Sequence, residues 1–422
     1  MTQKEIERTE IEAPYELPEG WKWCRLGDVA KFIGGGTPDK SNSSYWNGKI
    51  PWASVKDIKG DFLFSTEDFI TELGLHESSA SLCDENGLIL VTRISPGKSI
   101  ISKIKTAINQ DLKIIETEEF KPFLKYFFDF YEEEIKLLSS GTTVKGIKLD
   151  VLNSLPFPLP PTLAEQQRIV SRIESLFTKL DEARDKAQSM VDGFELRRAA
   201  VLHKAFTGEL TAKWRKENGV SDDSWEEKLF DSCIAKMQNG ISKRSGSEGE
   251  ETVVLRLANI GENDFDVSDL RTIKLTSKEQ DNYSLTRDDV VMIRVNGSKT
   301  NVGRQILVKN NNGWSFCDHI IRIKYETFCM PSYMVYFSHT KEYKDYVQDN
   351  MVSSAGQNTI SRKGLSNLTL KIPSLPEQQE IVRILDSVLE KESRAKEATQ
   401  TVLDQIALLK KSILARAFRG EL

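Results

Sequence analysis

The chain has 422 residues, of which 39% are hydrophobic and 29% are charged, a composition typical of a globular protein that folds in water. No apolar run reaches the ~18 residues needed to span a membrane, and the acidic, polar start (1–12) excludes a signal peptide. The five scattered cysteines form no Cys-x-x-Cys pair, which excludes a disulfide framework or zinc site and predicts a cytoplasmic protein. The net charge of −5 excludes nucleic-acid binding over the whole surface, so such binding would need local basic patches.

In chain order, the first half begins with strand-like segments and continues with helices. The strands are predicted from Val-, Ile- and Leu-rich runs bounded by Gly, Asn, Asp or Ser: Ile50–Val55, Gly87–Ile94, Ser99–Ile104 and Leu112–Ile115. An aromatic-rich helix is expected over 122–138, and a long helix over 165–206.

The second half predicts the same order of elements. Its strand-like runs are Thr252–Ile260, Asp289–Val295, Arg304–Val308 and His319–Tyr325. An aromatic-rich helix is expected over 331–347, and a second long helix ends near residue 417. Both halves therefore predict an α/β fold, while the pattern leaves the strand order open.

The chain contains an internal repeat of about half its length. Segment 165–210 aligns without a gap with 377–422, at an offset of 212, and 17 of these 46 positions are identical. The triplet Glu165-Gln166-Gln167 returns as Glu377-Gln378-Gln379, and the ending Phe-x-Gly-Glu-Leu occurs in both copies. The preceding segments correspond more loosely. We infer two constant modules and two variable modules that descend from one ancestral half.

Apolar residues in the two constant modules follow steps of four and three, the heptad pattern of a coiled coil. In the first module they are Ile169, Ile173, Leu176, Leu180, Ala183, Ala187, Met190, Phe194, Val201 and Ala205. In the second they are Ile381, Leu385, Val388, Ala395, Val402, Ile406, Leu409, Ile413 and Ala417. Two ordinary core helices are the alternative. The spacing favours two long helices that pack antiparallel as a coiled coil and give the chain a pseudo-two-fold repeat.

Two glycine-rich fragments resemble cofactor loops without matching them. The fragment 32–36 (Phe-Ile-Gly-Gly-Gly) resembles a methyltransferase loop for S-adenosylmethionine, but the sequence lacks the Asn/Asp-Pro-Pro-aromatic motif of DNA amino-methyltransferases. The fragment 96–99 (Pro-Gly-Lys-Ser) resembles the end of a P-loop, but Thr92 occupies the position of its first glycine. The four histidines have no metal-ligand spacing. We therefore expect no catalytic, cofactor or metal site, and glycine turns between elements instead.

Two corresponding stretches without acidic residues suggest contacts to DNA. Leu88–Gln110 and Val291–Cys317 each contain four basic residues, and the run from Arg93 to Lys98 aligns with the run from Arg294 to Lys299. Basic and small polar residues on a loop between strands suit phosphates and base edges, although a solvated hairpin is the alternative for any single residue. The basic loop 240–246 adds two further candidates. The predicted DNA-binding residues are Arg93, Ser95, Lys98, Lys103, Lys243, Arg244, Arg294, Asn296, Ser298, Lys299, Asn301 and Arg304.

Several motifs resemble those of the specificity subunits of type I restriction–modification systems. They are Leu17-Pro18-Glu19-Gly20-Trp21 followed by Leu26-Gly27-Asp28, then Gly35-Gly36-Thr37-Pro38, the duplicated Glu-Gln-Gln triplets after proline, and the two Phe-x-Gly-Glu-Leu endings. The resemblance extends over nearly the whole chain, and the duplicated helix start is its most specific part.

This resemblance implies two α/β target-recognition domains (1–158 and 213–372) and two spacer helices (159–212 and 373–422) that form an antiparallel coiled coil. Each domain would read one half of a bipartite sequence in double-stranded DNA, and the helices would set the unread gap. Two methyltransferase subunits and motor-nuclease subunits would bind this scaffold, and S-adenosylmethionine, ATP and Mg would belong to those partners. One departure is that the linker Thr211–Ser224 has no counterpart after the second copy, so the N-terminal arm (1–22) is expected to take its place.

Two other classes of function stay open at this point. A nucleic-acid-modifying enzyme with an unrecognised site would turn over a methyl donor without partners. A coiled-coil interaction protein would show absent or salt-insensitive binding to any DNA duplex.

Overall fold

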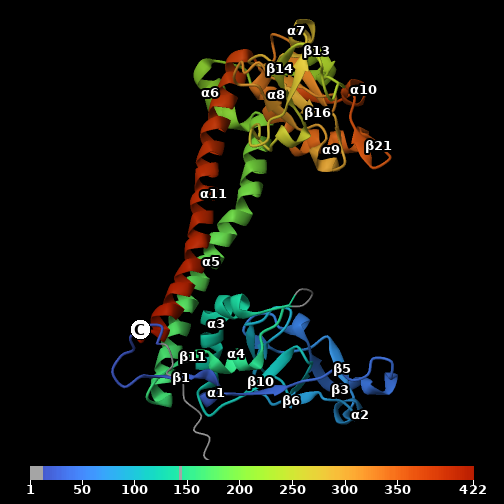
Figure 1. Cartoon of the computed structure of the whole chain (residues 1–422). Helices are drawn as coiled ribbons and strands as arrows, with labels where there is room; N and C mark the ends of the chain where they lie inside the picture. Colours follow the sequence, from blue (N-terminus) through green and yellow to red (C-terminus); the bar gives the residue numbers. More distant parts are fainter. Residues whose placement is uncertain (1–12, 142–144) are drawn as a thin grey trace, which may run out of the picture. The chain divides into compact units, whose positions relative to one another are not determined.

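The computed structural model describes residues 13–141 and 145–422, and the segment 1–12 considered above lies outside them. The chain divides into two compact units, each of which contains part of both long helices (Figure 1). Unit 1 comprises Met1–Gln188 and Gln400–Leu422, and unit 2 comprises Ser189–Thr399. Each unit mixes sheets and helices, which confirms the predicted α/β class.

Unit 1 contains two larger sheets and one short strand pair. Its strands are β1 (Lys22–Arg25), β2 (Lys31–Gly34), β3 (Trp46–Ala53), β4 (Phe62–Leu63), β5 (Asp68–Ile70), β6 (Ser81–Cys83), β7 (Leu88–Val91), β8 (Ser99–Ser102), β9 (Thr106–Ile108), β10 (Leu112–Glu116) and β11 (Pro156–Leu159). The shorter helices are α1 (Leu26–Val29), α2 (Glu72–His76), α3 (Lys121–Leu138) and α4 (Leu149–Ser154). The strand orders are β2-β10-β7-β8-β4, β5-β3-β9-β6 and β1-β11.

Unit 2 contains a similar set of elements. Its strands are β12 (Glu226–Leu229), β13 (Ile234–Asn239), β14 (Glu250–Leu255), β15 (Thr272–Leu275), β16 (Val290–Ile293), β17 (Val295–Asn296), β18 (Gln305–Leu307), β19 (Ser315–Phe316), β20 (Ile320–Tyr325), β21 (Val352–Ser354), β22 (Gln357–Thr359) and β23 (Thr369–Ile372). Its shorter helices are α6 (Ala212–Asn218), α7 (Ser277–Tyr283), α8 (Pro331–Ser338), α9 (Lys341–Asn350) and α10 (Arg362–Leu365). The strand orders are β13-β20-β16-β18, β15-β14-β19, β17-β22-β21 and β12-β23.

The two units share one topology at their centres. In unit 1, β10 lies between β2 and β7, just as β20 lies between β13 and β16 in unit 2, and β8 and β18 extend these sheets. In the second sheet, β3 pairs antiparallel with β5 and parallel with β9, as β14 does with β15 and β19. The diverged variable modules therefore retain the strand pairing of a common ancestor.

The central strand of each unit is buried on both faces. Strand β7 reads Leu-Ile-Leu-Val and β16 reads Val-Val-Met-Ile, and every one of these side chains is at most 2% exposed. Because successive side chains point to opposite faces, Leu88 and Leu90 pack with the aromatic residues of α3, while Ile89 and Val91 face the second sheet. Each buried side chain of this size contributes about 1.5–3 kcal/mol. This layering fixes the position at which each central strand ends.

The strand predictions are confirmed by β3, β7, β8 and β10 in unit 1 and by β14, β16, β18 and β20 in unit 2. The first aromatic helix is also confirmed, as α3. The second, predicted as one helix over 331–347, is divided into α8 and α9. Thr340 explains the division, because its hydroxyl donates to Phe337 O (2.7 Å) and accepts the N–H of Tyr343 (3.2 Å). A side chain that satisfies backbone groups in this way competes with the helix.

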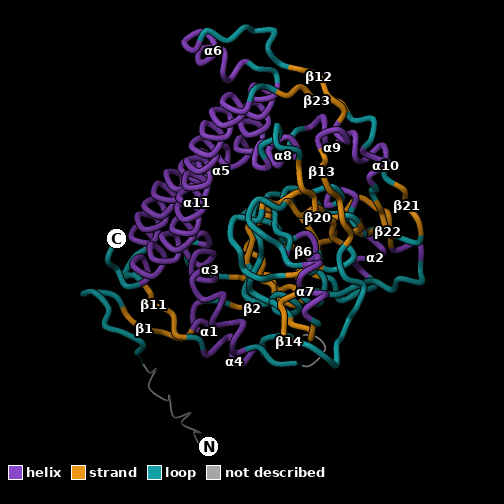
Figure 2. Tube along the Cα trace, turned by 90° about the horizontal axis from the view of Figure 1, so that it is seen from above, coloured by secondary structure: helices purple, strands orange, loops and turns teal. Residues whose placement is uncertain are grey.

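The long helices α5 (Leu163–Phe206) and α11 (Leu375–Phe418) pack antiparallel within each unit, side by side in Figure 2. In unit 1, Lys410 Nζ lies 2.7 Å from Asp181 Oδ1, and Ile169 and Leu414 share a buried cluster. In unit 2, the last part of α5 packs against the first part of α11, and Arg197 pairs there with Glu392 at 3.6 Å. The predicted coiled coil is therefore confirmed.

The predicted heptad seam is wrong at four positions. Ala183 is exposed, and Met190, Val402 and Leu409 are 52%, 43% and 49% exposed. An α-helix has 3.6 residues per turn, so a strict seven-residue pattern drifts around its surface. The buried residues follow that drift, and these four side chains lie outside the helix contact.

The phenylalanine of each repeated ending completes a domain core. Phe418 is fully buried in unit 1, where its ring centroid lies 5.0 Å from that of Phe123 and 5.5 Å from that of Phe130. In unit 2, Phe206 lies 4.9 Å from Tyr333. Each core therefore contains the beginning of one long helix and the end of the other.

The middle residue of the Glu-Gln-Gln triplets is a buried cap for a second helix. Gln166 Oε1 accepts the N–H of Phe120 (2.9 Å), the residue that precedes α3. Gln378 Oε1 accepts the N–H of Met330 (2.7 Å), the residue that precedes α8, and its amide nitrogen donates to Phe328 O. Both glutamines are at most 1% exposed. Since the first N–H groups of a helix lack partners within it, this side chain connects each long helix to its domain.

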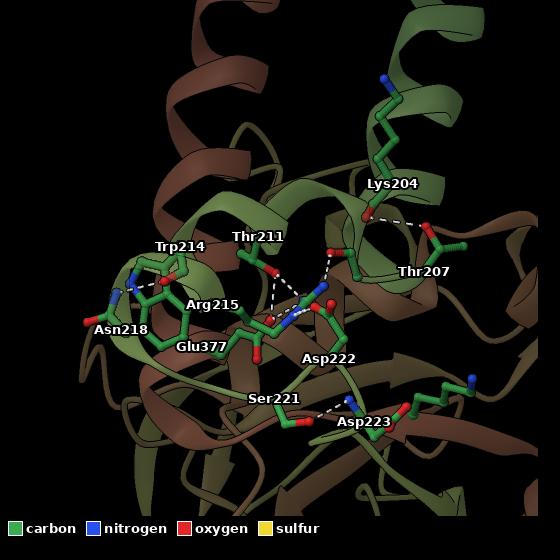
Figure 3. A network of polar contacts seen from close by, with 12 residues as sticks. Lys204, Thr207, Thr211, Trp214, Arg215, Asn218, Ser221, Asp222, Asp223 and Glu377 are labelled. Atoms are coloured by element: carbon green, nitrogen blue, oxygen red, sulfur yellow. Dashed lines mark hydrogen bonds and ion pairs between the residues drawn. The ribbon is translucent and has the colours of Figure 1, made fainter.

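The first residue of the triplet differs between the copies. Glu377 is fully buried and accepts hydrogen bonds from Thr211 Oγ1 (2.6 Å) and Arg215 Nη1 (2.7 Å), whereas Glu165 pairs with Arg168 near the surface. Arg215 of α6 also donates to Gly208 O at the end of α5, which joins the linker to both long helices in unit 2 (Figure 3).

The N-terminal arm takes the corresponding place in unit 1, as expected. Tyr15 Oη donates to Phe418 O (3.0 Å), and Pro18 lies against Gly420, which adopts the left-handed conformation that Gly208 adopts in the first copy. The described part of the arm is 13–22, and 1–12 lie outside the described residues. Within that described part, no helix is both long and apolar enough to cross a membrane.

We predict that Gln166→Ala and Gln378→Ala each lower the free energy of unfolding of their own unit by about 1–3 kcal/mol, because a buried N–H loses its acceptor. The exposed neighbours provide matched controls, Gln167→Ala and Gln379→Ala. Urea denaturation of the full chain, with hydrogen exchange followed separately in α3 and α8, measures the loss. Equal stability of the buried and control variants would contradict the capping role.

Candidate nucleic-acid interface

Each predicted basic stretch contains a loop at the same edge of equivalent sheets. Loop 1 (92–98) joins β7 to β8, and loop 2 (294–304) joins β16 to β18. Both loops follow a strand that is buried on both faces, so a rigid scaffold positions them. Surface loops on such a scaffold are common places for binding residues.

Backbone hydrogen bonds fix the start of the correspondence between the loops. The N–H of Thr92 donates to Asp111 O in unit 1, and the N–H of Arg294 donates to His319 O in unit 2. Each acceptor directly precedes a strand that pairs with the central strand. This strand is β10 in unit 1 and β20 in unit 2. Arg294 is therefore equivalent to Thr92, and the sequence alignment of Arg93 with Arg294 is wrong by one residue.

The end of the correspondence is fixed in the same way. The N–H groups of Gly97 and Gly303 donate to the last residues of β7 and β16, and both glycines have positive φ, +98° and +81°. Lys98 is therefore equivalent to Arg304, and its predicted alignment with Lys299 is also wrong. The physical reason is that loop 2 is four residues longer than loop 1, and this insertion carries Lys299.

Loop 1 presents basic and polar groups beside a strained backbone. Arg93 Nη1 lies 3.1 Å from Asp111 Oδ1, with the arginine side chain 49% exposed, while Ser95 is half-buried and Lys98 is exposed. Ile94 has φ of +72° and is 57% exposed. A β-branched residue in this conformation costs about 1–3 kcal/mol, and such strain concentrates at binding sites.

The structure does not bring Lys103 to loop 1. It follows the far end of β8, where its Nζ donates to Asn86 Oδ1 (2.9 Å) and lies 5.0 Å from the ring centre of Phe62. An antiparallel pair places the start of β8 and the end of β7 together, so Lys103 lies at the opposite edge of the sheet.

Loop 2 is supported by a small extra sheet. Strand β17 begins the loop and pairs with β22, which itself pairs with β21. Asn358 of β22 is 6% exposed, and its amide nitrogen donates to Gly297 O (2.9 Å) and Asn296 O (3.3 Å). Its oxygen accepts from Ser353 Oγ (2.6 Å). This satisfied amide fixes the backbone of the loop at its exposed part.

The polar side chains of loop 2 also order it internally. Asn296 Oδ1 accepts the N–H of Ser298 (2.8 Å), and Asn301 Oδ1 accepts from Arg304 Nη2 (2.7 Å). Lys299 is exposed. Each asparagine oxygen thus accepts one hydrogen bond within the loop. These two bonds do not use the NH₂ donors of the asparagine side chains.

The predicted basic loop 240–246 divides between two places. Arg244 pairs with Asp318 (3.0 Å), whose backbone oxygen accepts from Arg294 Nη1 (3.4 Å), so Arg244 belongs beside loop 2. Lys243 instead forms two 3.1 Å contacts with Glu279 of α7. Its charge is compensated there, and the structure does not bring it to loop 2.

The glycine fragments serve close packing. A Cβ on Gly35 would lie 2.3 Å from Ile108 O, and one on Gly240, the equivalent residue of unit 2, would lie 2.2 Å from Cys317 O. Gly97 of the P-loop-like fragment lies against the backbone of Glu132 in α3. These close approaches explain why both fragments contain glycine.

Cys317, Asp318 and His319 place their potential ligand atoms within 4.8 Å of one another. Burial raises the pKa of the Cys317 thiol, which keeps it protonated, and Arg244 already pairs with the carboxylate of Asp318. Metal ligands must be deprotonated and free to bind, so this group is a poor cation site.

Sequence patterns missed the groups that hold the loops. Asp111, Asp318 and Asn358 all contact a loop from another strand or turn. Asp111 and Asp318 each directly follow one of the two stretches without acidic residues, so that pattern does not include them. A polar residue just before β10 and just before β20 is the signal that indicates both aspartates.

A family model described as the type I restriction modification DNA specificity domain matches residues 18–188 and 229–404, once in each half of the repeat. The specificity subunit of the type I restriction enzyme StySPI from Salmonella potsdam is 29% identical over 422 residues, with 96% of this chain and 90% of that protein covered. The EcoKI specificity subunit from Escherichia coli strain K12 is 26% identical over 423 residues, with the same shares covered.

Solved structures have the same fold. A chain from a structure of complex assembly and conformational transition of the type I R-M system gives a TM-score of 0.74 at 20% identity, covering 97% of this chain and all of that one. The crystal structure of the HsdS subunit from Thermoanaerobacter tengcongensis gives 0.62 at 20% identity, covering 98% and 100%. Since the family model matches most of the sequence in two copies, the chain belongs to the type I restriction modification DNA specificity family.

Proposed function

We propose that the chain is the specificity subunit of a type I restriction–modification complex and that each unit reads one half of a bipartite DNA site. The observation that carries this proposal is the duplication of one scaffold with two different loops, loop 1 and loop 2, at equivalent positions. Two related readers with different side chains suit a split sequence with unlike halves. In functional terms, 1–158 and 213–372 are the reading domains, and 159–212 and 373–422 are the spacer helices.

Within loop 1, Arg93, Ser95 and Lys98 are proposed to contact DNA. In unit 2 the proposed contacts are Arg244, Arg294, Asn296, Ser298, Lys299, Asn301 and Arg304. Arginine and asparagine suit guanine and adenine edges, respectively, and lysine suits phosphates. We give Lys103 and Lys243 lower priority, because each is held away from its loop by another partner.

The constant helices are proposed to bind two copies of a methyltransferase subunit, and motor-nuclease subunits would join this complex for restriction. The repeat places Met190 at the same helical position as Val402, and Leu196 at the same position as Leu408. All four are exposed, Leu196 by 76% and Leu408 by 66%. Exposed leucines at matching positions of a duplicated helix suit two copies of one apolar partner surface.

The chain is proposed to have no catalytic site of its own. It is also proposed to act in the cytoplasm, where the DNA is. S-adenosylmethionine, ATP and Mg are proposed to bind to the partner subunits. The close packing of the glycine fragments and the arginine-paired Asp318 support this assignment.

Co-expression with the methyltransferase subunit of its system tests the function. We expect single-molecule sequencing to reveal methylated adenines in a split motif of two short half-sites, and to lose them when this chain is omitted. Methylation that persists without the chain, or a continuous motif in place of a split one, would contradict the proposal.

The partner surface is tested by stoichiometry. Leu196→Lys and Leu408→Lys should each reduce the number of bound methyltransferase subunits from two to one, and the double variant should bind none, because a central lysine costs an apolar interface at least about 2 kcal/mol. Native mass spectrometry counts the subunits.

Leu137→Lys is the matched control, since Leu137 is 79% exposed but lies on α3. Two bound subunits in all variants would exclude this helix surface.

A further inference from the structure

Three basic side chains from two separate segments line a cavity of about 290 Å³ in unit 2. Lys299 lies in the insertion of loop 2, Arg304 lies at the end of that loop, and Lys344 lies on α9. Sequence patterns had not associated Lys344 with loop 2, because α9 is about forty residues further along the chain. The fold brings these positive charges together.

Among the described residues, no carboxylate forms an ion pair with the three basic side chains of this cavity. Arg304 donates to two neutral oxygens, Gly261 O (3.2 Å) and Asn301 Oδ1 (2.7 Å). The acidic residue of the lining, Glu262, lies 3.8 Å from Arg198 of α5. Throughout 13–141 and 145–422, no carboxylate oxygen lies within the 4.0 Å of an ion pair from the charged nitrogens of Lys299, Arg304 or Lys344.

The electrostatic state of the neighbours agrees with this excess of positive charge. Burial and the charge of Arg198 lower the pKa of Lys344, and Arg304 contributes in the same direction, while Glu262 and Glu195 oppose the shift without reversing it. Burial and Arg198 also lower the pKa of His339 to about 3, so the imidazole is neutral at physiological pH and accepts from Arg198 Nη2 (3.1 Å). An anion in the cavity would relieve the repulsion among the lysine and arginine side chains.

The described residues of unit 1 show a different arrangement at the equivalent place. Gly303 of loop 2 lies against Val347 of α9, and its equivalent Gly97 lies against Glu132 of α3. Close to Glu132, Lys136 pairs with both Glu132 and Glu133. The lining of the basic cavity therefore depends on residues particular to unit 2.

We propose that Lys299, Arg304 and Lys344 together bind one backbone phosphate of the DNA beside the half-site read by loop 2. The inference rests on the proposed function and makes it more specific. Arg304 is thereby assigned to a phosphate instead of a nucleobase. The reason is that the Arg304 guanidinium, at the end of the loop, donates to Gly261 O and Asn301 Oδ1. A phosphate is singly charged, small and rich in acceptors, which suits a cavity surrounded by several donors.

The salt dependence of DNA binding tests this site, because the slope of log K against log salt counts the phosphates that are neutralised, at about −0.9 per phosphate. The complex with methyltransferase subunits is titrated with cognate and random duplexes between about 50 and 200 mM salt. Lys344→Ala and Arg304→Ala should each flatten the slope by up to about one unit with both duplexes. The double variant should lose no more than about one unit in total, because both residues serve the same phosphate.

Lys341→Ala is the matched control, because Lys341 is an exposed lysine on the same helix that pairs with Asp345. It should leave the slope unchanged, and Arg304→Lys should largely restore it. Thermal unfolding of each variant verifies that unit 2 is folded.

An unchanged slope in Lys344→Ala and Arg304→Ala would overturn the proposal, as would an effect confined to the cognate duplex, which would indicate base contacts. If inorganic phosphate protected loop 2 from hydrogen exchange while the slope was unchanged, the cavity would bind a free anion and the DNA assignment would be wrong. A wild-type complex that binds no duplex would contradict the proposed function itself.

Discussion

The structure depends on how each long helix is fixed at both ends in a domain core. At its start, a buried glutamine caps the first helix of the domain, Gln166 for α3 and Gln378 for α8. At its end, a phenylalanine of the repeated ending enters an aromatic cluster, Phe206 in unit 2 and Phe418 in unit 1. Each core thus needs one helix from each repeat. A single half would leave its domain without the second helix, which explains why the motif exists in two copies.

The same cores determine where DNA can be read. A central strand buried on both faces ends at the sheet edge, and the first N–H of the following loop donates to the residue that precedes the neighbouring strand. Evolution could change the loop length without changing the scaffold, and loop 2 shows this with its four additional residues and its supporting strands β17, β21 and β22. The insertion brings Lys299 towards α9 and into the lining of a basic cavity.

Much of the fold was predictable because it depends on local patterns. The apolar runs of β7 and β16, the heptads of α5 and α11 and the exact repeat at an offset of 212 are all visible in the sequence. The break at Thr340 was not, since it depends on one hydroxyl competing with the helix. The candidate site was predicted in part. Its two loops were found, but their alignment failed because the insertion is visible only through backbone hydrogen bonds, and the positions of Lys103 and Lys243 depend on distant partners, Asn86 and Glu279.

The central claim is that the two loops read different halves of one site independently. Methylation maps of Arg93→Ala and Arg294→Ala complexes, compared with the wild-type map, test it most directly. The account predicts that each variant relaxes the sequence of one half-site only, that the two variants affect opposite halves, and that the gap between the halves is unchanged. Relaxation of the same half by both variants, or of both halves by either one, would contradict it.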